Sequence, residues 1–301
     1  MDSRMNAWTW GLLVLLGLIW GGSFFFARIA VQHVPPLTLV FFRLLLAALA
    51  LHIYIAGRFD FYAILKARWR EFLILGLINN ALPHALIFFG QTRIGAGLAA
   101  ILNATTPIWT VLIANYFTSD EKLSPAKIAG CLVGLIGTIV LIGPGMSAGG
   151  EAPLWALLLP VLAAISYGFA ATYGKRFKDV PAPVTAAGQL TASSLIALPL
   201  SLLTDRPWAL AAPPLDALLA ILALALLSTA FGYILYFRIM ATAGATNASL
   251  VTLLVPPSAI LLGVLFLGER LALGELAGMA LIGFGLIILD GRAYRLLAKA
   301  V

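Results

Sequence analysis

Charged residues are scarce in this chain. Only 10% of its 301 residues are charged, and they comprise 12 acidic and 19 basic residues. Soluble domains carry roughly 25% charged residues, so this composition cannot build a water-facing surface. A hydrophobic content of 62% and a mean hydropathy of +1.02 instead indicate a chain that folds in a lipid bilayer, which supplies an apolar solvent.

Cysteine and histidine are scarce as well. The one cysteine, Cys131, excludes an internal disulfide and a cysteine metal cluster. The three histidines show no H-E-x-x-H spacing, and the acidic residues fall at the ends of the apolar runs. We therefore expect no catalytic residue, no metal and no cofactor, and an intramembrane enzyme is a disfavoured class.

Long apolar runs dominate what the chain does contain. A helix needs about 20 mostly apolar residues to cross a bilayer, and charged residues or Pro/Gly turns separate ten such runs. The sequence thus predicts an all-α integral membrane protein with ten transmembrane helices. Their expected ranges are 8–32, 36–56, 71–92, 95–118, 124–143, 153–174, 182–204, 214–241, 244–267 and 272–290.

Lysine and arginine are distributed unevenly between the loops. With the N-terminus placed in the cytoplasm, 14 of the 19 basic residues fall on the cytoplasmic side and 4 on the other, while Arg43 lies within a helix. This bias follows the positive-inside rule and accounts for the net charge of +7 without a nucleic-acid partner. We expect a multi-pass protein of the cell (inner) membrane, with both termini cytoplasmic and the first apolar run retained as a helix.

The two halves of the chain repeat each other. Residues 120–137 match 268–285 at an offset of 148, and the segment that ends at Pro107 matches the one that ends at Pro256 at an offset of 149. A weaker third match has an offset of 146. Similar offsets in the same order indicate an internal duplication.

An odd number of helices in each repeat has a geometric consequence. The halves, 1–146 and 147–301, each hold five predicted helices, so the second half enters the membrane from the opposite side. We therefore expect two inverted five-helix repeats related by an axis in the membrane plane. Many secondary transporters are built in this way and hold their solute near mid-membrane between the repeats.

The motifs within these repeats resemble a known family. They are the run IWGGSFFFARIAV at 19–31, the FFRLLLAA segment at 41–48, the Asn/Thr-rich helix that ends at Pro107, and the Glu-containing start of each half's last helix. These motifs are similar to those of the drug/metabolite transporter superfamily, of its EamA-domain exporters, and of the YddG-type exporters of aromatic amino acids. The resemblance covers essentially the whole chain and implies export. The first half departs from the usual Gly-Glu pair with DEKL at 120–123.

Polar and aromatic side chains recur on matching helix faces. Polar residues at membrane depth are costly and often mark a solute pathway, although Ser, Thr and Asn can also simply join helices. The third predicted helix carries such a face at spacings of four residues, and the offset of 149 carries that face into the second half. We expect a mid-membrane cavity whose substrate-binding residues are Trp20, Ser23, Phe24, Asn80, His84, Phe88, Asn103, Thr106, Tyr167, Tyr233 and Thr252.

This lining predicts the kind of cargo. Aromatic walls with a few neutral polar groups suit small amphipathic metabolites, above all amino acids including aromatic ones. The partners are then a small-molecule solute and the lipid bilayer, and the mechanism is alternating access. A carrier of phosphorylated sugars or drugs, or a channel, is the alternative; the sequence leaves the oligomeric state open.

Individual residues suggest further roles. His84 either lines the site or relays a proton, whereas we expect Arg43 to snorkel or to join helices rather than to bind solute. The apolar runs lack an interior carboxylate, which disfavours carboxylate-based proton coupling. Pro107 and Pro256, which are expected to interrupt the fourth and ninth helices, are predicted hinges for gating.

Overall fold

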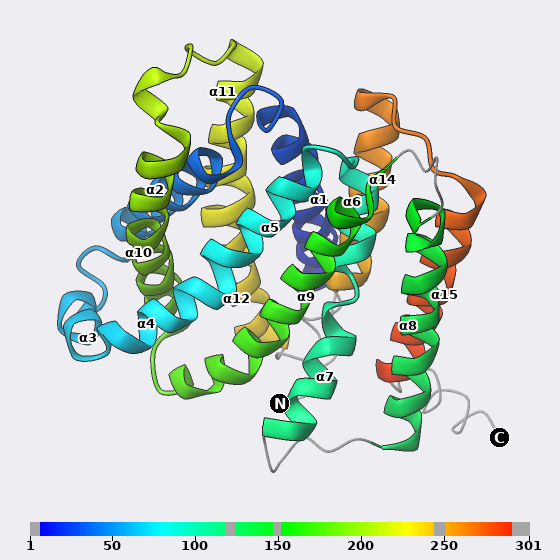
Figure 1. Ribbon diagram of the computed structural model, residues 1–301. Coiled ribbons are helices and arrows are strands. Elements are labelled where there is room, and N and C mark those ends of the chain that lie inside the picture. Colours follow the sequence, from blue (N-terminus) through cyan, green and yellow to red (C-terminus); the bar gives the residue numbers. More distant parts are fainter. Residues whose placement is uncertain (1–6, 118–123, 147–151, 244–250, 291–301) are drawn as a thin grey trace.

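The protein folds into a bundle of helices (Figure 1). The computed structural model describes residues 7–117, 124–146, 152–243 and 251–290. Within these ranges every regular element is helical and no strand occurs, which confirms the all-helical expectation. Both predicted cytoplasmic termini, and parts of the repeat motifs at 118–123 and 244–250, lie outside the described residues.

The helices follow the predicted apolar runs. Seven are long and apolar enough to cross a membrane, and the described chain adds three shorter apolar helices, so the count of ten stays a prediction. The elements are α1 (Ala7–Ala30), α2 (Pro36–Ile55), α3 (Phe61–Ala67), α4 (Trp69–Gly76), η1 (Leu77–Ala81), α5 (Leu82–Gln91), α6 (Ala96–Asn103), α7 (Thr106–Phe117), α8 (Pro125–Met146), α9 (Leu154–Gly174), η2 (Lys175–Phe177), α10 (Ala182–Leu200), η3 (Ser201–Asp205), η4 (Pro207–Ala209), α11 (Leu215–Leu222), η5 (Ala223–Phe231), α12 (Gly232–Ala243), α14 (Val251–Leu267) and α15 (Leu273–Asp290).

Two long helices widen into π-helical turns at corresponding places. The segment η1 joins α4 to α5, and η5 joins α11 to α12; at an offset of 149 residues η1 falls inside η5. Pro83, just after η1, lacks the N–H that would bond to the carbonyl of Ile78 in a π turn. Ser166 of α9 donates its hydroxyl to that carbonyl instead, at 2.7 Å. The wide turns bury Asn80 and Thr229 in the interior.

The fourth and ninth predicted helices differ at their prolines. The chain breaks between α6 and α7, just before Pro107. The carbonyl of Asn103, which would have bonded to the missing N–H of Pro107, accepts the hydroxyl of Thr106 at 2.7 Å. In contrast, α14 runs through Pro256. The expected interruption of the ninth helix is therefore wrong, because losing one backbone bond can bend a helix without ending it.

Helices of one half pack on helices of the other. The closely packed pairs include α1 with α14, α2 with α10, α5 with α9, and α8 with α15. The last pair lies at one edge of the bundle (Figure 1). Small residues bring its backbones together, since a Cβ added to Gly137 would lie 2.7 Å from the amide nitrogen of Ile282.

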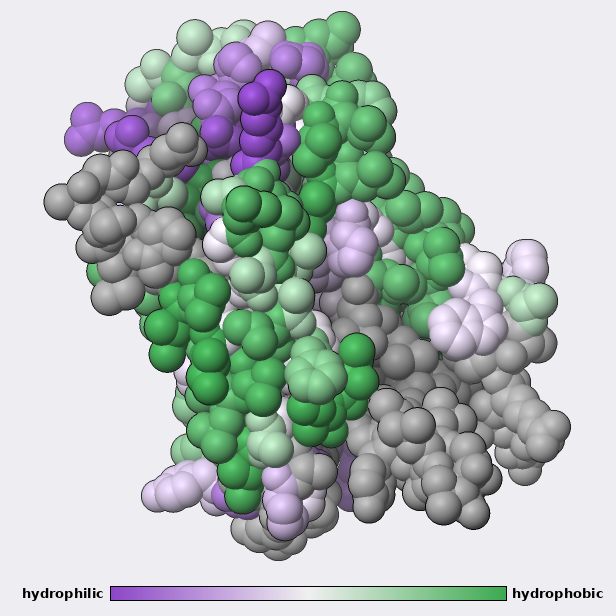
Figure 2. Space-filling view, turned by 90° about the vertical axis from the view of Figure 1, so that its right-hand side faces the viewer, coloured by the Kyte–Doolittle hydropathy of each residue, from purple (hydrophilic) through white to green (hydrophobic). Residues whose placement is uncertain are grey.

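The outer surface suits a bilayer. Large apolar side chains such as Leu265 and Phe284 are exposed, and Figure 2 shows hydrophobic residues over the middle of one face with hydrophilic residues gathered towards one end. Carboxylates lie at helix ends, as Asp205 illustrates. It accepts hydrogen bonds from the backbone N–H of Thr38 at 2.7 Å and from the Thr38 hydroxyl at 2.9 Å, in the first turn of α2, where backbone N–H groups lack helical partners.

The inverted arrangement can be tested by labelling. In a Cys131→Ala background, a cysteine at the exposed residue Asp60, after α2, should face the cytoplasm, and one at the exposed Trp208, after α10 and η3, should face the other side. A membrane-impermeant maleimide added to intact cells should label Trp208→Cys alone, and inside-out vesicles should reverse the pattern. Labelling of both cysteines from one side would contradict inverted halves.

Candidate functional site

A cavity of about 390 Å³ lies inside the bundle. Helices of both halves line it: α1, α2, η1, α5, α6, α7 and α9, with η5, α12 and α14. Ten of the eleven predicted substrate-binding residues lie on its wall: Trp20, Ser23, Phe24, His84, Phe88, Asn103, Thr106, Tyr167, Tyr233 and Thr252. The predicted hinge residue Pro107 lies there as well. The fold therefore brings together residues that are up to 232 positions apart, from Trp20 to Thr252.

Two predicted residues lie off this wall. Asn80 is fully buried behind it, where its Oδ1 accepts a hydrogen bond from the hydroxyl of Tyr233 at 3.2 Å. Asn79, its neighbour, lines the cavity instead and donates to the side chain of Gln189 at 2.9 Å. Pro256 is buried within α14 and is absent from the lining.

Aromatic rings form matching stacked pairs at the cavity, and of the two pairs His84, Phe88 and Tyr233 line its wall. The rings of His84 and Phe88 on α5 stack with centroids 6.2 Å apart and 13° between their planes. Tyr233 and Phe237 on α12, at an offset of 149 residues, stack at 5.8 Å and 16°. A third contact joins Trp20 to Tyr236 at 5.4 Å. Flat surfaces of this kind bind aromatic or apolar groups of a solute.

Arg43 lines the cavity, although the sequence predicts for it a snorkelling or helix-joining role rather than solute binding. It keeps only 8% of its surface exposed; its Nε donates to Thr229 Oγ1 at 3.0 Å, and its guanidinium lies 5.6 Å from the ring centroid of Phe88. The expected contact between helices is thus present, since Thr229 belongs to η5. The same side chain also lines the cavity.

Several buried polar atoms around the cavity have no partner among the described residues. They are Nδ2 of Asn80, Nδ1 of His84, Oε1 of Gln91 and Oδ1 of Asn103. An unpartnered buried donor or acceptor costs about 1–3 kcal/mol, and native proteins keep few of them. Gln91 is oriented by a 2.8 Å hydrogen bond from its Nε2 to the carbonyl of Phe24, which leaves Oε1 unpartnered. These atoms can accept or donate hydrogen bonds to water or to a bound molecule.

A second, wider depression of about 660 Å³ lies at one end of the bundle. Its wall combines the arginines Arg28, Arg93 and Arg270 with carboxylates that include Glu269. Glu269 accepts hydrogen bonds from the backbone N–H groups of Ala96 at 2.6 Å and Gly97 at 3.0 Å, at the start of α6. It thereby caps the helix that leads into the inner cavity.

The cap of α6 makes a prediction about stability. Glu269→Ala removes two charge-assisted hydrogen bonds and should destabilise the protein by about 1–3 kcal/mol. Gly263→Ala should act in the same direction, because the new Cβ would lie 2.4 Å from Oε2 of Glu269. Thermal unfolding in detergent measures both. Arg270→Ala, an exposed neighbour, and Gly283→Ala, with open space at its Cβ, are the controls; equal losses in all four variants would refute the cap.

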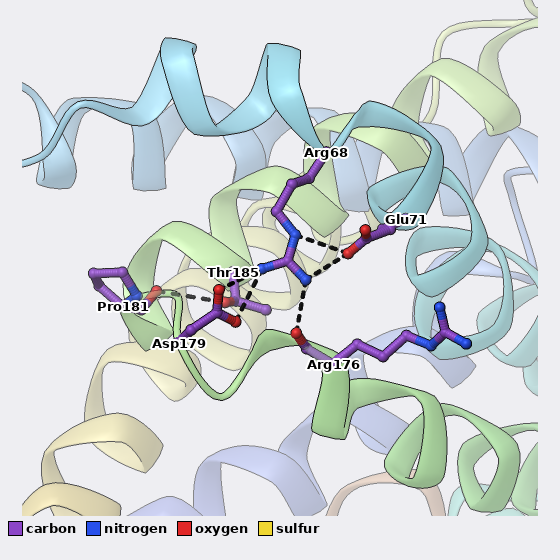
Figure 3. A network of polar contacts seen from close by, with 6 residues as sticks. All are labelled: Arg68, Glu71, Arg176, Asp179, Pro181 and Thr185. Carbon is purple, nitrogen blue, oxygen red and sulfur yellow. Dashed lines mark hydrogen bonds and ion pairs between the residues drawn. The ribbon is translucent and has the colours of Figure 1, made fainter.

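Arg68 ties the two halves together at the end predicted to be cytoplasmic (Figure 3). Its guanidinium donates to Glu71 at 2.8 Å, to Asp179 at 3.0 Å and to the carbonyl of Arg176 at 2.6 Å. It also lies 4.7 Å from the ring centroid of Phe177. The hydrogen bond from Arg68 lowers the pKa of the Asp179 carboxyl group. One cation thus links the start of α4 to the segment that precedes α10.

This link predicts a pH-dependent contribution to stability. Arg68→Ala should lower the thermal midpoint at pH 7 by roughly 2 °C or more, whereas Arg176→Ala should not, because only the main chain of Arg176 takes part. A carboxyl group whose pKa is lowered by folding stabilises the folded state above its unfolded pKa. The effect of Asp179→Asn should therefore be complete at pH 7, begin to shrink as the pH falls below about 3.8, and vanish below the lowered pKa of the folded state. A constant effect from pH 7 to pH 3 would exclude the ion pair as its cause.

Comparisons with known proteins agree with this geometry. Residues 8–143 and 154–289 each match the EamA-like transporter family. The chain is 25% identical to the uncharacterized transporter YoaV of Bacillus subtilis over 281 residues, 92% of this chain and 94% of that protein. It is 26% identical to the uncharacterized inner membrane transporter YedA of Escherichia coli over 292 residues, 97% and 93% of the two chains.

A solved structure also resembles the fold. A protein crystal structure superposes with a TM-score of 0.66 over 93% of this chain and 96% of its own, at 21% sequence identity. Identity this low shows the fold alone.

The two family matches divide the chain between residues 143 and 154, close to the boundary that the sequence predicts between its halves.

Proposed function

Because the chain belongs to the EamA-like transporter family, we propose that this multi-pass membrane protein exports small amphipathic metabolites, above all amino acids including aromatic ones. The observation that carries the proposal is the inner cavity, where stacked rings from both halves meet buried polar atoms that have no partner in the described chain. Its volume of about 390 Å³ lies within the 300–1,000 Å³ typical of small-molecule sites. The rings would hold an apolar side chain, and the amides and hydroxyls would orient the polar end of the solute.

Alternating access follows from the proposed inverted halves. The break before Pro107 lies on the cavity wall, where a small change of backbone angle would open or close the path. Pro256 lies within α14, which packs on α6. We propose these two sites as hinges, with both termini in the cytoplasm, so that each half in turn opens the cavity to one side.

The lining also bears on energy coupling and on the alternatives. The described residues that line the cavity include no Asp or Glu, which favours movement of the solute down its gradient without carboxylate-based proton exchange. A carrier of phosphorylated sugars would need several basic groups, and this wall offers one arginine and one histidine. A channel would conduct without saturation.

Transport by the purified protein in liposomes tests the proposal. Counterflow of phenylalanine should saturate with concentration and should not respond to a pH gradient, whereas glucose 6-phosphate should not move. Phe88→Leu should raise KM about 2- to 10-fold through lost stacking. The control Phe89→Leu should not, because Phe88 is 1% exposed and lines the cavity while its neighbour is 38% exposed.

Each other outcome has a clear meaning. Movement of the sugar phosphate without phenylalanine would replace the proposed substrate class. Accumulation driven by a pH gradient would overturn the uncoupled mechanism, and a flux that rises without saturation would favour the channel. Equal effects of Phe88→Leu and Phe89→Leu would remove the inner cavity from the transport path.

A further inference from the structure

We infer that Arg43 binds the carboxylate of the transported solute, so that the substrate class is restricted to molecules that carry a carboxylate beside an aromatic or apolar body. This inference rests on the proposed function and adds the chemical group that the site recognises. The observation behind it is a buried guanidinium on the cavity wall that has no carboxylate partner in the described part of the chain.

The charge of Arg43 is deeply buried yet incompletely paired. Its one recorded hydrogen bond among the described residues runs from Nε to the neutral hydroxyl of Thr229. The ion pairs that Arg68 forms with Glu71 and Asp179 lie away from this cavity wall. A buried charge without an opposite charge is strongly disfavoured, and a solute carboxylate would accept the two parallel hydrogen bonds that a guanidinium offers.

The guanidinium of Arg43 lies against the ring of Phe88, which belongs to the stacked pair of His84 and Phe88. Arg43 lies 5.6 Å from the Phe88 ring centroid, and Phe88 stacks in turn on His84. A carboxylate bound to Arg43 would therefore place the body of the solute beside the aromatic wall. The site offers one cation next to a hydrophobic surface, and an amphipathic carboxylate matches both features.

The other half of the molecule shows that the fold does not require this charge. α2 begins at Pro36 and α10 at Ala182, and at this offset of 146 residues Arg43 corresponds to Gln189. Gln189 joins α10 to η1 through Asn79, just as Arg43 joins α2 to η5 through Thr229. A neutral amide thus makes the equivalent contact between helices, so the positive charge of Arg43 serves something other than packing.

Two unpartnered acceptors favour an amino acid over a simple acid. Oε1 of Gln91 and Oδ1 of Asn103 are buried without a partner in the described residues, and both side chains line the cavity with Arg43. Carbonyl oxygens of this kind accept hydrogen bonds from an ammonium group. The cavity thus offers a cation for the carboxylate and neutral acceptors for the amino group.

Matched ligands and variants test this inference. Binding of phenylalanine, 3-phenylpropionate and phenylalanine amide is measured as the ligand-induced shift of the thermal midpoint of purified protein. Wild type should prefer both carboxylates to the amide by about 10-fold or more in Kd, the size of one charge-assisted contact. Arg43→Gln copies its counterpart Gln189 and should abolish this preference, while Arg43→Lys should keep part of it. The exposed control Arg93→Gln should match wild type.

The outcomes separate this inference from the proposed function. If wild type does not distinguish the carboxylates from the amide, or if Arg43→Gln keeps the preference, the inference is overturned. If Arg43→Gln does not fold, the wild-type preference and its reduction in Arg43→Lys decide the question. If carboxylates bind through Arg43 but no amino acid moves across liposomes, the inference stands and the proposed cargo is wrong.

Discussion

Backbone polar groups in a bilayer must find partners within the protein, and this constraint explains why the irregular turns lie where they do. At three places where a helix breaks, widens or begins, a side chain bonds to the backbone group that lacks a helical partner. The hydroxyl of Thr106 bonds to the carbonyl of Asn103, that of Ser166 bonds to the carbonyl of Ile78, and Glu269 caps α6. Such departures are tolerated in a membrane where they line a cavity. The inner cavity and the irregular turns therefore depend on each other.

The duplicated halves keep the same framework but differ in charge. The stacked pair of His84 and Phe88 has its counterpart in Tyr233 and Phe237, and π-helical turns stand at corresponding places. Arg43 breaks this likeness, because Gln189 stands in its place in the second half. Arg43 lines the cavity, whereas its neutral counterpart Gln189 does not. A positive charge from one half alone can orient a bound molecule even though the surrounding helices are nearly equivalent.

Most of the fold and much of the cavity wall could be predicted from the sequence, for identifiable physical reasons. The apolar runs predict where the helices lie, and the spacing of four residues between His84 and Phe88 predicts that both lie on one helix face. A regular helix would place Asn80 on the same face as His84. The extra residue in the π turn η1 rotates the chain, so that Asn79 lines the cavity. The position of Arg43 could not be predicted from its own segment, since a lone arginine in an apolar run is equally compatible with snorkelling. Its contacts with Thr229 from the other half and with the ring of Phe88 hold it in the interior.

The position of Arg43 on α2 also bears on how the site can move. α2 packs on α10. Asp205, the last residue of η3 after α10, accepts a hydrogen bond from Thr38 in the first turn of α2, and His52 in the last turn of α2 is hydrogen-bonded to Thr191 of α10 at 2.9 Å. The α2–α10 pair is therefore joined by hydrogen bonds at two levels. Another part of the cavity wall includes the break between α6 and α7, where the backbone lacks a continuous ladder of hydrogen bonds. A recognition group on the joined pair can keep its geometry while the broken wall rearranges, which is the arrangement that selective alternating access requires.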